Sequence, residues 1–410
     1  MATVISEVTG AGPTMDSFFD APGPDWEFVA QATALRPLLR ENAAAGEARR
    51  QVLDETIDAM VCAGLFSIAV PKRFGGAGQN FRTFIETVSE IARGDGSAGW
   101  VAALTNVCTW FATLFSEEAQ QDVFGANPKA RVCGIFTPAQ SCERVDGGLR
   151  VSGKWPYGSG SMWADWGTLG VQIGTLPDGS PELGLGLIPL SDLRIEDTWF
   201  MSGMAGTASN TLVAEGIFVP NHRIIPFAAM LAEDYAREYD EEPNYFASFA
   251  PVAALVLIAA QIGLGRAALD ITLSKGATKP VLYTVFSEAK DSPAHQIQTA
   301  QAATDIDAAY LLAIRACADV DAHALRREKL DPLTRARIRM DTGKCGELIR
   351  GAINRLMSVN GASSFGTANP LNRIWRDSEV ASRHAFVLPE FAELIYGRVL
   401  FGITEPVQPY

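Results

Sequence analysis

The stretch LRVSGKWPYGSG, residues 149–160, decides the fold class because it marks a change in the pattern of the chain. It is rich in strand-forming residues and follows the turn signal Asp146-Gly147-Gly148, so it predicts the second strand of a hairpin. Similar short runs fill residues 130–240. Apolar residues recur at helical spacing before this zone, from Trp26 to about Asn127, and after it, from Phe246 to about Phe401. The sequence therefore predicts an α+β protein whose β-domain lies between two helical regions.

These patterns divide the chain into four expected parts. The parts are a flexible N-terminal arm (residues 1–24), an N-terminal helical domain (25–129), a central antiparallel β-domain (130–240) and a C-terminal helical bundle (241–410). In the bundle we expect three long helices, Pro251–Lys275, His295–Arg327 and Leu333–Asn360, the last of them closed by Gly361. Ser97 is expected to cap the helix that carries Trp100.

The composition argues against several classes of function. Lys and Arg total 34 and Asp and Glu total 47, a formal charge of −13, so we expect no basic face for nucleic acid or for an anionic membrane. The most apolar stretch, Ala250–Gly263, is too short to span a bilayer. The six cysteines and four histidines show no metal-ligand spacing, and the N-terminus does not resemble a signal peptide. We therefore expect a cytoplasmic enzyme without a metal.

Two segments carry the candidate chemistry. In GKWPYGSGSMWADW, residues 153–166, aromatic rings offer flat faces, glycines let the backbone approach a planar ligand, and Ser159 offers a hydroxyl. An edge strand followed by a loop is the simpler interpretation, and neither a GxSxG nor a GxGxxG motif is present there. In NRIWRDSEVASRH, residues 372–384, His384 is a candidate acid–base group, although a single histidine is more often structural.

Several motifs, taken in their order, resemble the acyl-CoA dehydrogenase superfamily over about Phe28 to Phe401. They are LFSIAVPKRFGGAG (65–78), GDGSAGW (94–100), LRVSGKWPYGSG (149–160), GMAGTASNTLVAEGIFVP (203–220) and IWRD (374–377). The resemblance implies an acyl-CoA dehydrogenase-like fold, with an N-terminal helical domain, a central antiparallel β-domain and a C-terminal four-helix bundle. It also implies a homotetramer and a flavin between the β-domain and the bundle.

The catalytic base of the dehydrogenases is not matched. Their carboxylate removes a substrate proton, and Ala385 occupies the position where it commonly follows the Arg-Asp pair. Pro243–Leu269, which would contain the alternative base, has no acidic residue. Glu379 and Glu390 are near enough in sequence that an acyl-CoA dehydrogenase with a displaced carboxylate stays an alternative. A scaffold that binds no flavin is a third.

The segment after Arg376 instead resembles the flavin-dependent monooxygenases of this superfamily, the oxygenase components of two-component systems. Hydroxyphenylacetate and dibenzothiophene oxygenases and amino-sugar N-oxygenases are of this type, and their histidine eight residues past the arginine matches His384. The resemblance implies an oxidoreductase that takes reduced FMN, with FAD as the alternative, from a separate reductase. With O₂ the flavin forms a C4a-hydroperoxide, which oxygenates nitrogen or carbon of a small organic substrate, such as an amino sugar or a natural-product intermediate.

The resemblance also implies roles for individual residues. Ser159 and His384 are the expected catalytic residues. The expected flavin contacts are Phe136, Thr137, Tyr157, Ser159, Asn360, Gly361, Ser363 and Ser364, the last four from a neighbouring subunit. The expected substrate contacts are Trp100, Cys108 and Ala205. Cys108 stands where aromatic hydroxylases have a second histidine; because a thiol is a poor base, N-oxidation or another oxidation stays open, and helix packing is its simpler role. Ala205 stands where acyl-CoA-binding relatives have arginine.

Overall fold

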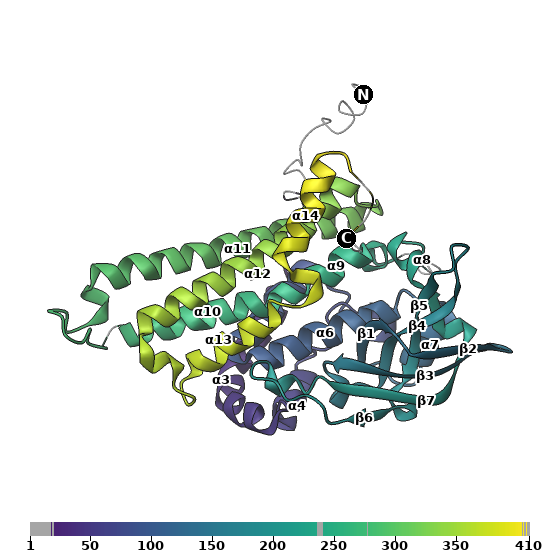
Figure 1. The fold of residues 1–410 in the computed structure, drawn as a ribbon, viewed down its shortest axis with the longest axis horizontal. Coiled ribbons are helices and arrows are strands. Elements are labelled where there is room, and N and C mark those ends of the chain that lie inside the picture. The colour runs from purple at the N-terminus through teal and green to yellow at the C-terminus, as the bar shows by residue number, and fades with distance from the viewer. Residues whose placement is uncertain are drawn as a thin grey trace.

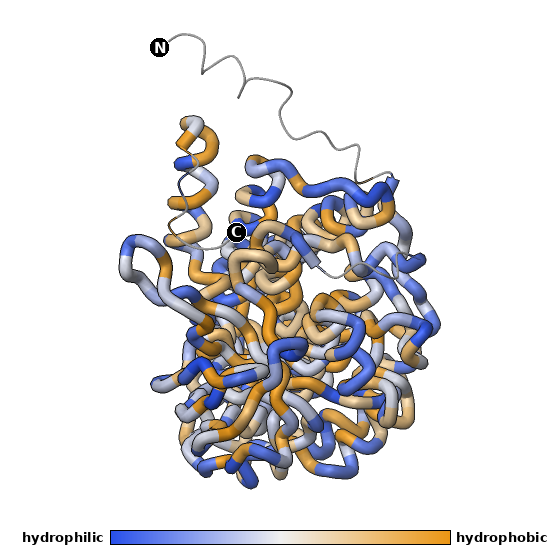
Figure 2. Tube along the Cα trace, turned by 90° about the vertical axis from the view of Figure 1, so that its right-hand side faces the viewer, coloured by the Kyte–Doolittle hydropathy of each residue, from blue (hydrophilic) through white to orange (hydrophobic). Residues whose placement is uncertain are grey.

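The computed structural model describes residues 18, 20–235, 241–276, 278–403, 405 and 407. The expected N-terminal arm, residues 1–24, lies largely outside them. The described chain runs through helices, then strands, then helices, in the expected order (Figure 1). Hydrophobic and hydrophilic residues alternate along these elements (Figure 2), as expected where one face of each is buried.

The N-terminal region is helical. Its α-helices are α3 (Trp26–Arg49), α4 (Asp54–Cys62), α5 (Phe81–Gly94), α6 (Gly96–Ala112) and α7 (Glu117–Phe124). Almost every residue of α6 is buried, because the helix lies among α5, the first sheet and the C-terminal bundle. The prediction that Ser97 caps α6 is wrong. The cap is Asp95, whose extended backbone brings its carboxylate within 3.0 Å of the Ser97 N–H.

The central region consists of two four-stranded sheets. In order across the first sheet the strands are β1 (Val132–Pro138), β4 (Trp166–Thr175), β5 (Pro181–Pro189) and β8 (Ile224–Pro226). Across the second they are β2 (Ser141–Val145), β3 (Gly148–Gly158), β7 (Asn210–Pro220) and β6 (Arg194–Glu196). Trp155 of β3 is fully buried in the cluster between the sheets.

The expectation of an antiparallel domain holds for every strand pair except one. β1 and β4 are parallel, whereas the other paired strands run antiparallel. The β2–β3 hairpin explains this exception. It belongs to the second sheet, so the chain crosses over and returns beside β1 in the same direction, as a parallel pair requires.

The C-terminal region is again helical. Its α-helices are α8 (Phe227–Leu231), α9 (Phe249–Leu255), α10 (Leu257–Gly276), α11 (Pro293–Arg326), α12 (Pro332–Asn360), α13 (Pro370–Ala381) and α14 (Pro389–Leu400). Helices α10 to α13 lie side by side and form the bundle (Figure 1). Gly361 ends α12 with a positive φ of 67°, as expected. Two of the three predicted long helices, His295–Arg327 and Leu333–Asn360, are confirmed to within a few residues as α11 and α12. The predicted helix Pro251–Lys275 is instead divided at Val256 into α9 and α10.

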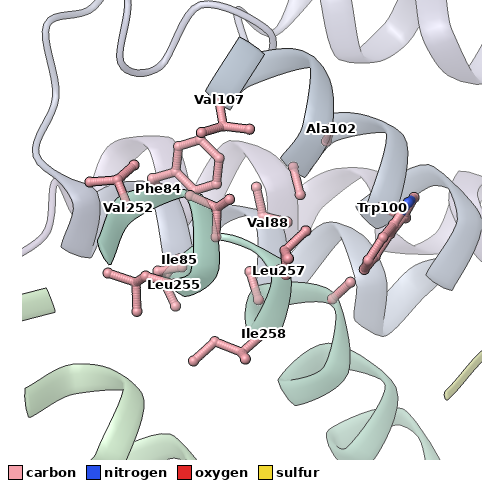
Figure 3. Packing of buried hydrophobic residues seen from close by; sticks show 14 of the residues in the cluster. Phe84, Ile85, Val88, Trp100, Ala102, Val107, Val252, Leu255, Leu257 and Ile258 are labelled. Carbon is pink, nitrogen blue, oxygen red and sulfur yellow. The ribbon is translucent and has the colours of Figure 1, made fainter. Parts of the chain in front are cut away.

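One core connects the two helical regions. Apolar side chains of α5 and α6 interdigitate with those of α9 and α10, and Trp100 lies at the edge of this cluster (Figure 3). The stretch Phe249–Gly276 is long and apolar enough to cross a membrane, but 89% of its most apolar window is buried inside the protein, as in a core helix. This shared core holds α6, and with it Trp100, in a fixed position against the bundle.

Candidate functional site

Trp100 brings the two expected catalytic residues together. Its indole N–H donates a hydrogen bond of 3.3 Å to the Ser159 hydroxyl, just after β3. Its ring lies 5.9 Å from the His384 imidazole, between the centroids, at an angle of 60°. The three residues come from the N-terminal helices, the β-domain and the bundle. The candidate site is therefore the place where these three parts meet.

The end of β3 holds an aromatic residue in an unfavourable backbone conformation. Tyr157 has φ 68° and exposes 66% of its surface, with its ring edge against Trp199. The glycines that follow leave no room for a side chain: a Cβ on Gly158 would lie 2.8 Å from the Asn210 carbonyl oxygen, and one on Gly160 would lie 2.6 Å from Thr105 Oγ1. Strain of this kind is concentrated at functional sites. The loop is packed against β7 and α6 and presents the Tyr157 ring outward.

A row of buried hydroxyl groups continues inward from Ser159. The Ser159 and Ser209 oxygens are 2.6 Å apart, and the Ser209 and Thr207 oxygens are 2.7 Å apart. Thr207 Oγ1 donates to the carbonyl oxygen of Met204 at 2.8 Å. Sequence reasoning missed Thr207 and Ser209. The only signal was their place in the motif at residues 203–220, which is not specific for a site.

The Arg-Asp pair of α13 fixes the loop that carries this row. Asp377 Oδ1 accepts the Met204 N–H at 2.5 Å, and Arg376 donates to the Ser202 carbonyl oxygen and to Glu47. Asp377 Oδ2 is buried without a hydrogen-bond partner among the described residues. Burial, and less so the charge of Asp95, raise the pKa of Asp377 to about 7. The pair thus acts in the structure as a clamp between the bundle and the β-domain.

His384 is held as a neutral imidazole. Its Nδ1 accepts the backbone N–H of Phe386 at 3.3 Å, at the start of the 3₁₀ turn η9 (Ala385–Val387). Burial, together with the nearby Arg339 cation, lowers the pKa of His384 to about 4. Because Nδ1 is an acceptor, the single proton of the neutral ring belongs on Nε2. His384 therefore presents a hydrogen-bond donor at Nε2.

No carboxylate replaces the missing dehydrogenase base within the described part of this segment. Ala385 is exposed, and its carbonyl oxygen accepts from Arg339 at 2.9 Å. Glu379 is hydrogen-bonded to Arg383 at 2.5 Å and to Asn354 at 3.2 Å. Glu390 is exposed in the first turn of α14. The two glutamates of the displaced-base alternative thus either bond elsewhere or face away from the interior.

Cys108 and Ala205, two of the expected substrate contacts, are buried. A Cβ on Gly134 of β1 would lie 2.7 Å from the Cys108 sulfur, so the thiol fills the contact between α6 and β1. Burial raises the pKa of Cys108 well above its usual range, so the thiol stays protonated. Ala205 begins the 3₁₀ turn η4 (Ala205–Thr207), in the loop held by Asp377.

The expected flavin contacts fall into separate groups. Phe136 packs against Phe111, Phe227 and Phe249, and Thr137 beside it is exposed. The loop made of Asn360, Gly361, Ser363 and Ser364 lies at the end of the bundle away from the β-domain (Figure 1). Within one chain this loop does not meet the other expected contacts.

Comparisons with known proteins agree with this fold. Family models match residues 29–125 (acyl-CoA dehydrogenase, N-terminal domain) and residues 255–389 (acyl-CoA dehydrogenase, C-terminal domain). The chain is 33% identical to a flavin-dependent monooxygenase, oxygenase subunit HsaA, from Rhodococcus jostii, over 90% of this chain and 97% of that protein. It is 30% identical to the oxygenase component of an FADH₂-dependent resorcinol hydroxylase from a Rhizobium species, over 94% and 97% of the two chains.

A solved structure is similar along almost the whole length. The Streptomyces protein XiaF, in complex with FADH₂ and glycerol, superimposes with a TM-score of 0.89 at 31% identity. The match covers 93% of this chain and 96% of that one.

Proposed function

The chain belongs to the oxygenase components of flavin-dependent monooxygenases, which have the acyl-CoA dehydrogenase fold, and from this premise we propose that it hydroxylates a small aromatic compound. Such a component takes reduced flavin from a separate reductase. The observation that carries the proposal is the convergence of Ser159, Trp100 and His384 at one place.

The residues at this place suit a flavin. Tyr157 offers an exposed ring for stacking, and Thr137 is exposed for the pyrimidine side. Ser159 offers a buried hydroxyl for the centre of the ring system, and the buried Ser161 hydroxyl has no hydrogen-bond partner among the described residues. Reduced flavin, when bound, supplies the electrons that activate O₂. The resorcinol hydroxylase is FADH₂-dependent, and the XiaF structure contains FADH₂. We therefore propose FAD as the flavin, in place of the FMN that the sequence suggested.

A second copy of the chain completes the flavin site in this proposal. The loop at residues 360–364 is remote from Tyr157 in the same chain, so a neighbouring copy would have to bring it to the flavin tail. Helix α14 projects from the bundle (Figures 1 and 2) and exposes Phe391, Leu394 and Leu400, an apolar surface suited to subunit contacts. We propose a homotetramer, and light scattering would measure its mass. The cysteines are all free, which fits the proposed cytoplasmic location.

His384 acts in this proposal as a hydrogen-bond donor more than as a base. Its neutral ring holds a proton at Nε2, where it would contact the oxygen being transferred. Ser159, which accepts the Trp100 N–H, would contact the flavin centre. Burial of Ser159 and Trp100 excludes water, which protects oxygen transfer from loss as hydrogen peroxide.

The surroundings of His384 favour an aromatic substrate. The rings of Trp100 and Phe386 flank the imidazole with centroids 5.9 and 6.2 Å away and offer flat apolar faces. The Cys108 thiol stays protonated and cannot deprotonate a phenol. We therefore propose an electron-rich aromatic compound that needs no base at position 108. An amino sugar stays a prediction that no observation here favours.

Stopped-flow mixing of O₂ with protein that holds reduced FAD tests the proposal. We expect a transient absorbance that belongs to neither reduced nor oxidised flavin. Direct oxidation at the rate of free flavin, with a panel of aromatic acceptors present, would overturn the proposal. Anaerobic bleaching of oxidised flavin by an acyl-CoA would instead identify a dehydrogenase, and failure to bind either redox form would identify a flavin-free scaffold.

A further inference from the structure

We infer that Thr207 and Ser209 orient the Ser159 hydroxyl so that it can only accept a hydrogen bond on its flavin side, and that this makes the site discriminate against oxidised flavin. The inference rests on the proposed function, because it places the flavin centre beside Ser159. It concerns two residues that the resemblance did not assign.

Counting protons gives the direction of the row. Three oxygen–oxygen contacts of 2.6 to 2.8 Å join Ser159, Ser209, Thr207 and the Met204 carbonyl. Each contact this short needs one proton between its oxygens, and the carbonyl has none to give. The three hydroxyl protons are therefore all used, and each points away from Ser159 towards Met204.

The Met204 carbonyl group, which accepts the last proton of the row, is fixed in its orientation. The Met204 carbonyl oxygen also accepts the Trp199 indole N–H at 2.9 Å, and the Met204 N–H is bound to Asp377. Met204 has φ 53° and Ala208 has φ 46°, two left-handed residues that shape the loop around the row. Ser209 and Thr207 are buried, so water does not offer an alternative partner.

The free side of Ser159 follows from this direction. Its proton is given to Ser209, and one lone pair is taken by the Trp100 N–H. What is left is a lone pair. Reduced flavin carries a proton on N5 and can donate to this lone pair, whereas oxidised flavin has only a lone pair on N5 and is repelled. The row thus raises the affinity of the site for reduced flavin, which must bind first, and lowers its affinity for oxidised flavin, which must leave after turnover.

Three variants test the inference through flavin binding. The dissociation constants of oxidised and of reduced FAD are measured by equilibrium titration, the latter without oxygen. In Ser209→Ala the Ser159 hydroxyl loses its acceptor, so its proton can be donated to N5 of oxidised flavin. In Thr207→Val the Ser209 hydroxyl loses its acceptor and donates to Ser159 instead, which again leaves the Ser159 proton for N5. We expect the ratio of the oxidised to the reduced constant to fall roughly two- to tenfold in both, the worth of one neutral hydrogen bond. Thr207→Ser should keep the wild-type ratio.

Control variants separate orientation from general loosening. Thr113→Val removes another buried hydroxyl that donates to a carbonyl oxygen, that of Trp110, outside the row, and should not move the ratio. When Ser159 is already alanine, the further substitution Ser209→Ala should no longer change the ratio of the two dissociation constants. An unchanged ratio in Ser209→Ala and Thr207→Val overturns the inference. If Ser209→Ala does not fold, the comparison of Thr207→Val with Thr207→Ser decides it.

The outcome can be told apart from a failure of the proposed function. Wild-type protein that shows the transient absorbance with O₂, together with variants that keep the wild-type ratio, refutes the orientation alone. Wild-type protein that binds no flavin refutes both.

Discussion

Asp377 of the bundle accepts the backbone N–H of Met204 at 2.5 Å, across 173 positions of the chain. The same loop ends the hydroxyl row that begins at Ser159. The motif IWRD thus reaches the candidate site through the Asp377 side chain, which binds the backbone of the loop that holds the row. Asp377 also faces the charges of Asp95, Arg373 and Glu47, so its protonation is coupled to them.

Asp377→Asn should make stability less dependent on pH. The pKa of Asp377 is raised to about 7, so the folded protein keeps a proton that the unfolded chain releases above about pH 4. This contribution is fully present below pH 4 and is lost as pH rises through 7. Asparagine is neutral throughout and can still accept from Met204. We expect the urea midpoint to fall less between pH 5 and pH 8 in this variant.

Part of the pH dependence should stay in that variant, because burial raises the pKa of Asp95 to about 6 and that of Asp321 to about 7. Asp307→Asn, at an exposed position of α11, is the control. In this variant the urea midpoint should fall between pH 5 and pH 8 as much as it does in the wild-type protein. An identical slope in Asp377→Asn and wild type would show that Asp377 titrates normally.

His384→Ala should uncouple oxygen transfer. Without the Nε2 donor we expect several-fold less product per flavin oxidised and a matching rise in hydrogen peroxide. His384→Gln, which offers an amide N–H, should recover part of the yield. His323→Ala is the matched control, because the His323 ring bonds the Asp319 carbonyl oxygen within α11. Unchanged coupling in His384→Ala removes His384 from the mechanism.

The pH profile of the wild-type enzyme tests the protonation state of His384. Because its pKa is lowered to about 4, the ring stays neutral from pH 8 to about 5. Product yield per flavin should be flat over this range and should fall only as pH approaches 4. A histidine with an ordinary pKa near 6.5 would give an inflection in product yield at that pH. Such an inflection would show that burial does not lower the pKa of His384.

Cys108→Ala should leave coupling unchanged, because the buried thiol stays protonated and fills the contact between α6 and β1. Gly134→Ala should lower the melting temperature, since its Cβ would lie 2.7 Å from the Cys108 sulfur. The double variant should regain most of that loss, because the alanine at 108 makes room for the new methyl group. Additive losses in the double variant, or lost coupling in Cys108→Ala, would speak for a role beyond packing.

Tyr157→Gly should stabilise the flavin-free protein while it weakens flavin binding. A left-handed backbone costs a non-glycine residue about 1 kcal/mol or more, which glycine avoids, but the stacking ring is lost. Tyr283→Gly is the control: Tyr283 is also left-handed, with φ 62°, and fully exposed outside the site, so stability should rise without a change in flavin affinity. If Tyr157→Gly binds flavin as well as wild type, Tyr157 does not stack on it.

Local features of the fold could be predicted because they depend on neighbouring residues. Apolar periodicity located the long helices, Asp146-Gly147 located the β2–β3 turn, and Gly361 located the end of α12. The error at Ser97 was of the same local kind, since two residues near the start of α6 were both suited to cap it. The parallel pairing of β1 with β4 depends on how the chain crosses between sheets, which no local pattern records.

The sequence by itself determined the order of helical and β regions and, through its motifs, the resemblance that pointed to Ser159 and His384. Only the tertiary structure decided what these groups present to a ligand. The proton on His384 depends on Phe386 and on the burial of the ring, and the direction of the Ser159 hydroxyl depends on Ser209, 50 positions away. The physical reason is that a hydroxyl or an imidazole takes its donor or acceptor role from its partners, and packing brings those partners together from distant parts of the chain.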